Sequence, residues 1–208
     1  LIEAAITENT RAILATHVYG NACDVEAIEK IAQKYKLVVI YDGAHAFGAN
    51  YLGKSLLSYG DFATCSFHAT KLFHTVEGGA IVTNTPERHE KMHLMRAFGH
   101  RGDDYFFMGV NGKNSEVHAA MGLCNLPMVP QLIQARKAVC DVYTELLDWS
   151  RLSAPQWADG LERNYSYYPL VFESEEKLLQ VRDVLAQHEI VPRRYFYPSL
   201  NQLPFLKE

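Results

Sequence analysis

A strand–helix–strand pattern near the start of the chain constrains the fold most. The apolar run over residues 11–18 leads to Gly20, and Asp24 can cap a helix that extends to about residue 35. Residues 37–41 follow as a continuous apolar run, which is typical of a parallel strand covered on both faces. The pattern predicts a βαβ unit, and therefore an α/β fold with a mostly parallel sheet between helices.

The rest of the first 150 residues predicts two further strands and three helices. These elements span residues 61–67, 79–84, 86–98, 115–124 and 129–148. Residues 2–8 are expected to end another helix. The segment 99–114, GHRGDDYFFMGVNGKN, predicts a long glycine-rich loop of the kind that often serves function.

A second, smaller α/β unit is expected after the linker-like RLSAPQWADG. It would contain a strand over Tyr165–Phe172, a helix over Ser174–His188 and a strand-like VPRRYF. The chain stops before this unit is complete. We therefore expect a large domain over residues 1–150 and part of a small domain over residues 151–208.

Composition excludes several classes of function. The net charge of −4 gives none of the basic excess of a nucleic-acid binder. No apolar run reaches the roughly 20 residues of a membrane span, and LIEAAITENT lacks the pattern of a signal peptide. The four cysteines are scattered without a CxxC pair, which favours free thiols in the cytoplasm. Nine histidines are present without zinc-type spacing, so no metal site is expected.

Two residues at strand ends are candidates for chemistry. Asp42 comes directly after the apolar strand, and Lys71 lies a few residues beyond the strand over 61–67. Alone, such an aspartate is often a turn residue, and such a lysine is usually a solvated surface charge. Open α/β sheets place ligands at the carboxyl ends of their strands, so the acid and the amine could converge there.

The segments around these residues resemble two motifs of the fold-type-I pyridoxal-phosphate enzymes. YDGAHAFG contains Asp42, and SFHATKLFHTVEGGA contains Lys71. More narrowly, they are similar to the DegT/DnrJ/EryC1/StrS family of nucleotide-sugar aminotransferases. The resemblance extends over nearly the whole chain, through H-x-Y-G at 17–20, GVNGKNSEVHAAMGL at 109–123 and RRYFYP at 193–198.

This resemblance implies a role for each matched residue. Lys71 would be the Schiff-base lysine that holds pyridoxal 5'-phosphate, and Asp42 the carboxylate that keeps the pyridine nitrogen protonated. Ser66 would bind the cofactor phosphate, and His45 would lie near the phenolic oxygen. Without the motif, Ser66 would simply close a strand and His45 would be a core histidine.

Other matched residues concern substrate and partner. Asn111 would reach the phosphate of the neighbouring subunit's cofactor, which implies a homodimer with a shared active site. His68, in the lysine loop, would contact substrate. Arg194 and Tyr195 have the charge and aromatic surface that suit a diphosphate and a sugar or base. RRYFYP could equally be an edge strand.

The function implied is a transaminase. It would move an amino group from an amino acid, by family habit L-glutamate, to a nucleotide-linked keto-6-deoxy sugar at C4 or C3. Such enzymes serve lipopolysaccharide, O-antigen or antibiotic sugar biosynthesis. The alternative is a catalytically silent cofactor-binding relative with a regulatory or assembly role, against which the intact Asp42, Ser66 and Lys71 argue.

Two further readings are disfavoured. Related dehydratases carry histidine where this chain has Lys71. A Rossmann-type nucleotide binder would need G-x-G-x-x-G between a strand and a helix, and no such motif occurs. Family members also carry an N-terminal segment that grips the phosphate and stacks on the ring, and a longer C-terminal part. We therefore expect this chain to be a fragment.

Overall fold

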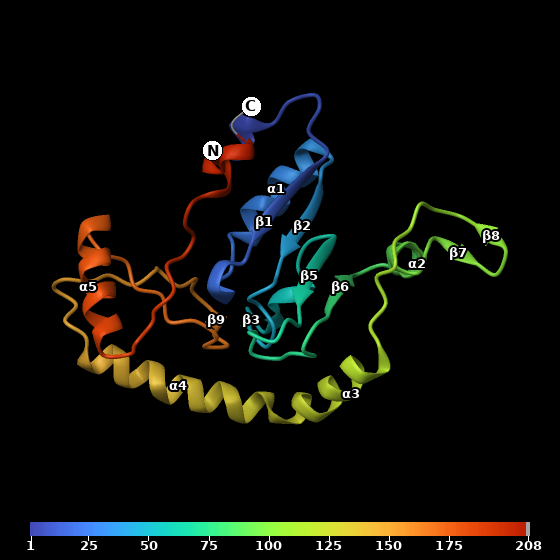
Figure 1. The fold of residues 1–208 in the computed structure, drawn as a ribbon. Helices are drawn as coiled ribbons and strands as arrows, with labels where there is room; N and C mark the ends of the chain where they lie inside the picture. The colour runs from blue at the N-terminus through green and yellow to red at the C-terminus, as the bar shows by residue number, and fades with distance from the viewer. Residues whose placement is uncertain (207–208) are drawn as a thin grey trace. The chain divides into compact units, whose positions relative to one another are not determined.

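The computed structural model describes residues 1–206 (Figure 1). These residues divide into two compact units. The first comprises Leu1–Leu146 and Gln156–Pro169, and the second comprises Leu147–Pro155 and the residues from Leu170 onward. The segment Gln156–Pro169 thus belongs to the first unit although it begins within the predicted linker and continues beyond it. The division into domains at residue 150 stays a prediction.

The first unit is built on a four-stranded sheet in the order β1-β2-β5-β6. Its strands are β1 (Ala12–Thr16), β2 (Val38–Asp42), β5 (Phe62–Ser66) and β6 (Gly79–Thr83). The first three are parallel, and β6 runs antiparallel to β5. The mostly parallel sheet that the sequence predicts is confirmed.

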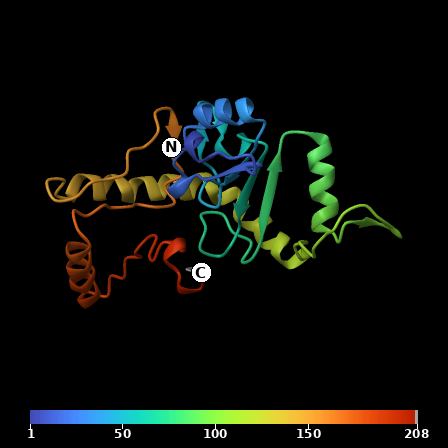
Figure 2. The ribbon, with the colours of Figure 1, turned by 90° about the horizontal axis from the view of Figure 1, so that it is seen from above.

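Helix α1 (Val25–Tyr35) covers one face of this sheet (Figure 2). It begins at Asp24, whose carboxylate accepts a hydrogen bond from the Ala27 N–H at 3.0 Å, and it ends at Lys36, which is left-handed with φ 53°. Its apolar face packs against three strands. The resulting core contains Ile13, Val25, Ile28, Ala32, Val39, Tyr41 and Ala63.

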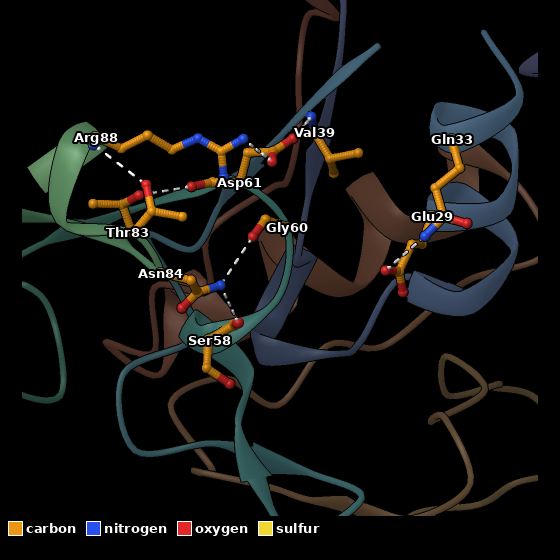
Figure 3. A network of polar contacts seen from close by, with 10 residues as sticks. Glu29, Gln33, Val39, Ser58, Gly60, Asp61, Thr83, Asn84 and Arg88 are labelled. Carbon is orange, nitrogen blue, oxygen red and sulfur yellow. Dashed lines mark hydrogen bonds and ion pairs between the residues drawn. The ribbon is translucent and has the colours of Figure 1, made fainter. Parts of the chain in front are cut away.

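Helix α2 (Pro86–Arg96) is fastened to the sheet by a carboxylate (Figure 3). Asp61 Oδ1 accepts from Arg88 Nη2 at 2.6 Å, and its Oδ2 accepts from the Val39 N–H at 2.7 Å. The Thr83 hydroxyl donates to the Asp61 carbonyl at 3.0 Å. One side chain therefore joins β2 to α2 just before β5 begins.

The remaining elements are short strands and helices. Two-residue strands form a small antiparallel sheet, β4 (Lys54–Ser55), β3 (Asn50–Tyr51) and β9 (Leu161–Glu162), and a hairpin, β7 (His100–Arg101) with β8 (Asp104–Tyr105). The helices are α3 (Glu116–Asn125), α4 (Val129–Leu146) and α5 (Glu175–Gln187). Single 3-10 turns occur at Glu3–Ala5, Val18–Gly20, Leu56–Ser58, Leu126–Met128, Leu200–Gln202 and Pro204–Leu206. Among residues 1–206, no helix is long and apolar enough to cross a membrane.

Three predicted elements are wrong. Residues 2–8 contain only the 3-10 turn, and neither Tyr165–Phe172 nor VPRRYF forms a strand. Tyr165 has φ 52°, which interrupts an extended backbone, and the segment contributes only a single bridge between Val171 and Ser153. Side chains bind its backbone in place of a sheet, since Arg136 donates to the Ser166 carbonyl.

Candidate active site

Asp42 ends the central strand β2, with Thr16 and Thr64 beside it on the neighbouring strands. Its Oδ1 accepts from the Ala44 N–H at 2.9 Å, which turns the chain sharply after the strand. Gly43 lies within this turn, where a Cβ would come within 2.9 Å of the Thr64 carbonyl oxygen. The carboxylate is therefore fixed at the edge where the parallel strands end, as predicted.

The loop that carries Lys71 connects β5 to β6 and is closed at its base. Phe67 N–H donates to the Gly78 carbonyl at 2.8 Å, and Thr75 N–H donates to the Phe67 carbonyl at 2.9 Å. The Thr75 hydroxyl donates to the Glu77 carbonyl at 2.7 Å. A Cβ on Gly78 would lie 2.3 Å from that hydroxyl, so glycine is required in the EGG sequence.

Hydrophobic side chains anchor the middle of the loop. Leu72 and Phe73, directly after Lys71, are buried in a cluster with Val129 of α4, and Phe47 and Phe67 pack against this cluster. Lys71 itself sits on a turn, where its N–H donates to the His68 carbonyl at 2.9 Å. The lysine is thus half-buried and held on both sides, unlike a freely solvated surface charge.

The charges of Lys71 and Asp42 both affect the pKa values of His45 and Cys65. Half-burial lowers the pKa of His45, the positive charge of Lys71 lowers it further, and Asp42 opposes both effects. Burial raises the pKa of the Cys65 thiol to about 11, with Lys71 lowering it and Asp42 raising it. Lys71 and Asp42 thus both influence His45 and Cys65, and the convergence of the two residues in one site stays a prediction.

His45 is held by groups from distant parts of the chain. Its Nδ1 accepts from the Tyr19 N–H at 3.0 Å, so the neutral ring carries its proton on Nε2. The Tyr167 ring lies 4.3 Å away, centre to centre. Buried Asn164 donates to the carbonyl oxygens of His45 and Phe47 at 2.8 and 2.9 Å. Tyr19 itself is left-handed, with φ 59°.

His17 is a residue of this site that the sequence prediction did not include. It lies directly after β1, is wholly buried, and stacks on Tyr41 at 4.4 Å. Its Nδ1 accepts from the Cys23 N–H at 3.1 Å. The H-x-Y-G motif was the available signal. Its histidine accepts from the Cys23 N–H, and the N–H of its tyrosine donates to His45.

Ser66 and His68 lie at the start of the lysine loop. Ser66 is the last residue of β5, where it pairs with Gly79, and its Oγ accepts from the His68 N–H at 3.4 Å. The His68 ring binds the Thr70 hydroxyl at 2.9 Å and lies 3.7 Å from the Glu77 carboxylate. The two ends of the loop are thus linked across Lys71.

The other predicted residues lie further along the chain. Asn111 forms an isolated bridge with Ala97 and is exposed. In the second unit, Arg194 binds Glu175 at 2.8 Å, and its guanidinium lies 3.3 Å from the centre of the Tyr197 ring. Tyr195 lies under Arg193 at 5.3 Å.

The side chains around Asp42 suit pyridoxal phosphate. The loop offers an amine, the strand end offers a carboxylate with Oδ2 left over, and His17 Nε2 is a buried nitrogen without a partner in the described part of the chain. An amine, a carboxylate and neutral donors are the groups that this cofactor requires. Residues 1–206 contain no cluster of three or more His, Cys, Asp or Glu side chains that could hold a metal.

Solved sugar aminotransferases share this fold. DesI, determined with its TDP-sugar product, gives a TM-score of 0.91 at 29% identity, covering 100% of this chain and 54% of DesI. The PLP form of the putative sugar aminotransferase Spr1654 from Streptococcus pneumoniae gives 0.90 at 27% identity, covering 99% and 59%. The chain therefore has the fold of the fold-type-I pyridoxal-phosphate transferases.

Residues 1–208 match the DegT/DnrJ/EryC1/StrS aminotransferase family, and the chain belongs to this family. The dTDP-4-amino-4,6-dideoxy-D-glucose transaminase of Shigella dysenteriae is 43% identical over 203 residues, which cover 96% of this chain and 55% of the relative. An Escherichia coli transaminase of the same name is 34% identical, with 99% and 57% covered. The chain thus spans little more than half the length of these relatives.

Proposed function

We propose that the whole protein is a pyridoxal-phosphate-dependent aminotransferase. It transfers an amino group from an amino acid, L-glutamate by family habit, to a nucleotide-linked keto-6-deoxy sugar at C4 or C3. The observation that carries this proposal is the position of two residues on neighbouring parallel strands: Asp42 ends β2, and Lys71 lies on the closed, anchored loop that follows β5. The name of the Shigella relative supports a sugar substrate and favours C4.

Each residue contributes a different function to the reaction. When bound, pyridoxal phosphate supplies the electron sink for a carbanion at the amino acid Cα. Lys71 supplies the amine that holds the cofactor, and it then moves a proton at that Cα. Asp42 uses its remaining oxygen to retain the proton of the pyridine nitrogen. Ser66 binds the phosphate, and His45 offers its Nε2–H to the phenolic oxygen.

Substrate contacts are proposed for three further residues. His68 lies in the lysine loop and presents a ring nitrogen, and Arg194 and Tyr195 provide a cation and an aromatic face. Arg194 is paired with Glu175, so a diphosphate would have to compete with that carboxylate. Guanidinium groups bind phosphates through paired hydrogen bonds, which favours this exchange.

A homodimer completes the proposed site, with Asn111 reaching the cofactor phosphate of the neighbouring subunit. The segment before Asn111 supports an interface. Its aromatic and apolar side chains are strongly exposed in the single chain, including Tyr105 at 76% and Met108 at 92%. All four cysteines are free, which accords with a cytoplasmic location.

The test uses the full-length protein with added cofactor. We expect visible absorbance from cofactor joined to a lysine, and borohydride reduction should fix the cofactor on Lys71, as read by peptide mass. Lys71→Ala should abolish both signals, whereas Lys54→Ala, at an exposed lysine of the same unit, should retain them. Covalent labelling that survives Lys71→Ala would refute the assignment.

Incubation with L-glutamate separates an aminotransferase from a silent cofactor-binding relative. Loss of the visible band and release of 2-oxoglutarate are expected from the proposed enzyme. A band that no amino donor changes would support a regulatory or assembly role. Product analysis with dTDP-linked keto-6-deoxy sugars would then identify the carbon that receives the amine.

A further inference from the structure

His17 occupies a single, rigid position beside the strand that ends in Asp42. Its side chain is 0% exposed, and its ring stacks on Tyr41 at an interplanar angle of 19°. Its backbone N–H donates to the Asp42 carbonyl oxygen at 3.0 Å. Backbone and ring are therefore both fixed against β2, at the residue proposed to bind the cofactor nitrogen.

The hydrogen bond to Cys23 determines which ring nitrogen carries the proton. His17 Nδ1 accepts from the Cys23 N–H at 3.1 Å, so a neutral ring must be protonated at Nε2. Burial lowers the pKa of His17 to about 4, and Asp42 acts in the opposite direction. At neutral pH the side chain is therefore an uncharged donor with one proton to offer.

That proton has no acceptor within the described part of the chain. Nε2 is buried and lacks a hydrogen-bond partner there. Buried donors are almost always paired, because an unpaired one loses its bonds to water without replacement. Asp42 is the group whose charge acts on this ring, and the Ala44 N–H occupies only its Oδ1.

We propose that His17 is a positioning residue for Asp42: one buried water accepts the His17 Nε2–H and donates to the Asp42 carboxylate. The carboxylate is then held between two donors, the Ala44 N–H and the water that His17 binds. The proposal rests on the proposed function in one respect, the role of Asp42 toward the cofactor.

The first arm of the test observes the bond without the cofactor. In the full-length apoprotein labelled with nitrogen-15 histidine, the His17 resonances are identified by their loss in His17→Asn. We expect a protonated Nε2 and an unprotonated Nδ1, and we expect the Nε2–H signal to shift in Asp42→Asn. A proton on Nδ1, or an Nε2–H signal that Asp42→Asn leaves in place, would overturn the proposal.

The second arm compares two variants that both lose the stacked ring. His17→Gln can return an N–H near the position of Nε2, whereas His17→Asn can accept from Cys23 but is too short to reach the proposed water. If the Nε2–H positions Asp42, His17→Asn should weaken cofactor binding roughly ten- to a hundredfold, which is the range for losing a hydrogen bond to a charged group. His17→Gln should recover most of that affinity. Equal loss in both variants would mean that His17 only fills space.

The two arms separate this proposal from the proposed function. If the full-length protein binds no pyridoxal phosphate, the proposed function fails, and the resonance experiment still decides whether His17 and Asp42 are linked. If the cofactor binds but Asp42→Asn leaves the Nε2–H signal unchanged, the positioning role fails alone.

Discussion

The side-chain amide of Asn164 donates a hydrogen bond of 2.8 Å to the backbone carbonyl of His45, a residue 119 positions earlier in the chain. The same amide binds the Phe47 carbonyl, and its oxygen accepts from the Ser166 N–H at 3.1 Å. Asn164 is only 2% exposed. A single buried side chain therefore fixes the segment Gln156–Pro169 to the turn that carries His45.

Replacement of Asn164 should destabilise the protein strongly. Asn164→Ala removes three hydrogen bonds and leaves two buried carbonyl groups and one N–H without this partner, so we expect a loss of about 2–4 kcal/mol in the free energy of unfolding. Gln33→Ala, which removes an exposed bond to Glu29, is the control and should change stability by less than about 0.5 kcal/mol. Denaturant unfolding of the full-length protein measures both. Similar values for the two variants would contradict the structure.

Stability should depend on pH through His17. The folded protein keeps this ring neutral down to about pH 4, whereas the unfolded chain protonates it near pH 6.5. As the pH falls through this window, the unfolded state binds a proton that the folded state does not, so stability is lost. The loss should reach about 2 kcal/mol by pH 5. His45, whose pKa is also lowered, adds in the same direction.

Comparison with a variant isolates this effect from other titrating groups. Unfolding free energies between pH 7 and 5 should fall less steeply in His17→Gln than in the wild-type protein, whatever the absolute stability of the variant. If the unfolding free energy fell equally steeply with pH in both proteins, His17 would not contribute to the pH dependence of stability.

The carboxylate of Asp61 should contribute more to the stability of the protein than an ordinary surface ion pair does (Figure 3). Asp61→Ala removes the bond to Arg88 and leaves the Val39 N–H without an acceptor, so we expect a loss of about 1–3 kcal/mol in stability. Lys137→Ala breaks a bridge to Asp141 of the same 2.6 Å length, and should cost less than about 1 kcal/mol because that pair is exposed. Thermal and denaturant unfolding compare the two. An equal cost would show that the Val39 contact contributes nothing.

Mixing two inactive variants tests whether the active site is shared between subunits, as proposed. Full-length Lys71→Ala and Asn111→Ala should each have greatly reduced transaminase activity. If Asn111 serves the neighbouring subunit, a hybrid dimer contains one intact site, and an equal mixture should recover about a quarter of the wild-type activity after subunit exchange. If Asn111 serves its own subunit, the mixture should recover none.

Local chemistry made much of this fold predictable from sequence. Asp24, Thr85, Ser115 and Ser174 each accept an N–H from the first turn of a helix, and the starts of these helices were predicted within one or two residues. The continuous apolar runs identified the parallel strands. Because parallel strands end at a common edge, Asp42 and Lys71 could be expected near each other.

Contacts between distant residues were not predictable in the same way. The H-x-Y-G motif includes His17, but it does not show the contacts of this histidine, which depend on Cys23, Tyr41 and Asp42 together. The predicted strand over Tyr165–Phe172 failed for a related reason. Its aromatic side chains contact other elements, Tyr168 with Thr144 of α4 and Tyr167 with His45. The side chain of Arg136 binds its backbone in place of a neighbouring strand.

The bond between Asn164 and His45 also bears on how the protein is made. A ribosome releases Asp42 and Lys71 long before Asn164 and Tyr167, so the nascent chain carries both proposed site residues without the segment that holds the turn between β2 and β3. Contacts that close over such long sequence separations form late and slowly. We therefore expect the proposed cofactor to bind after synthesis has passed this segment, so that its supply would influence the finished protein rather than its early folding.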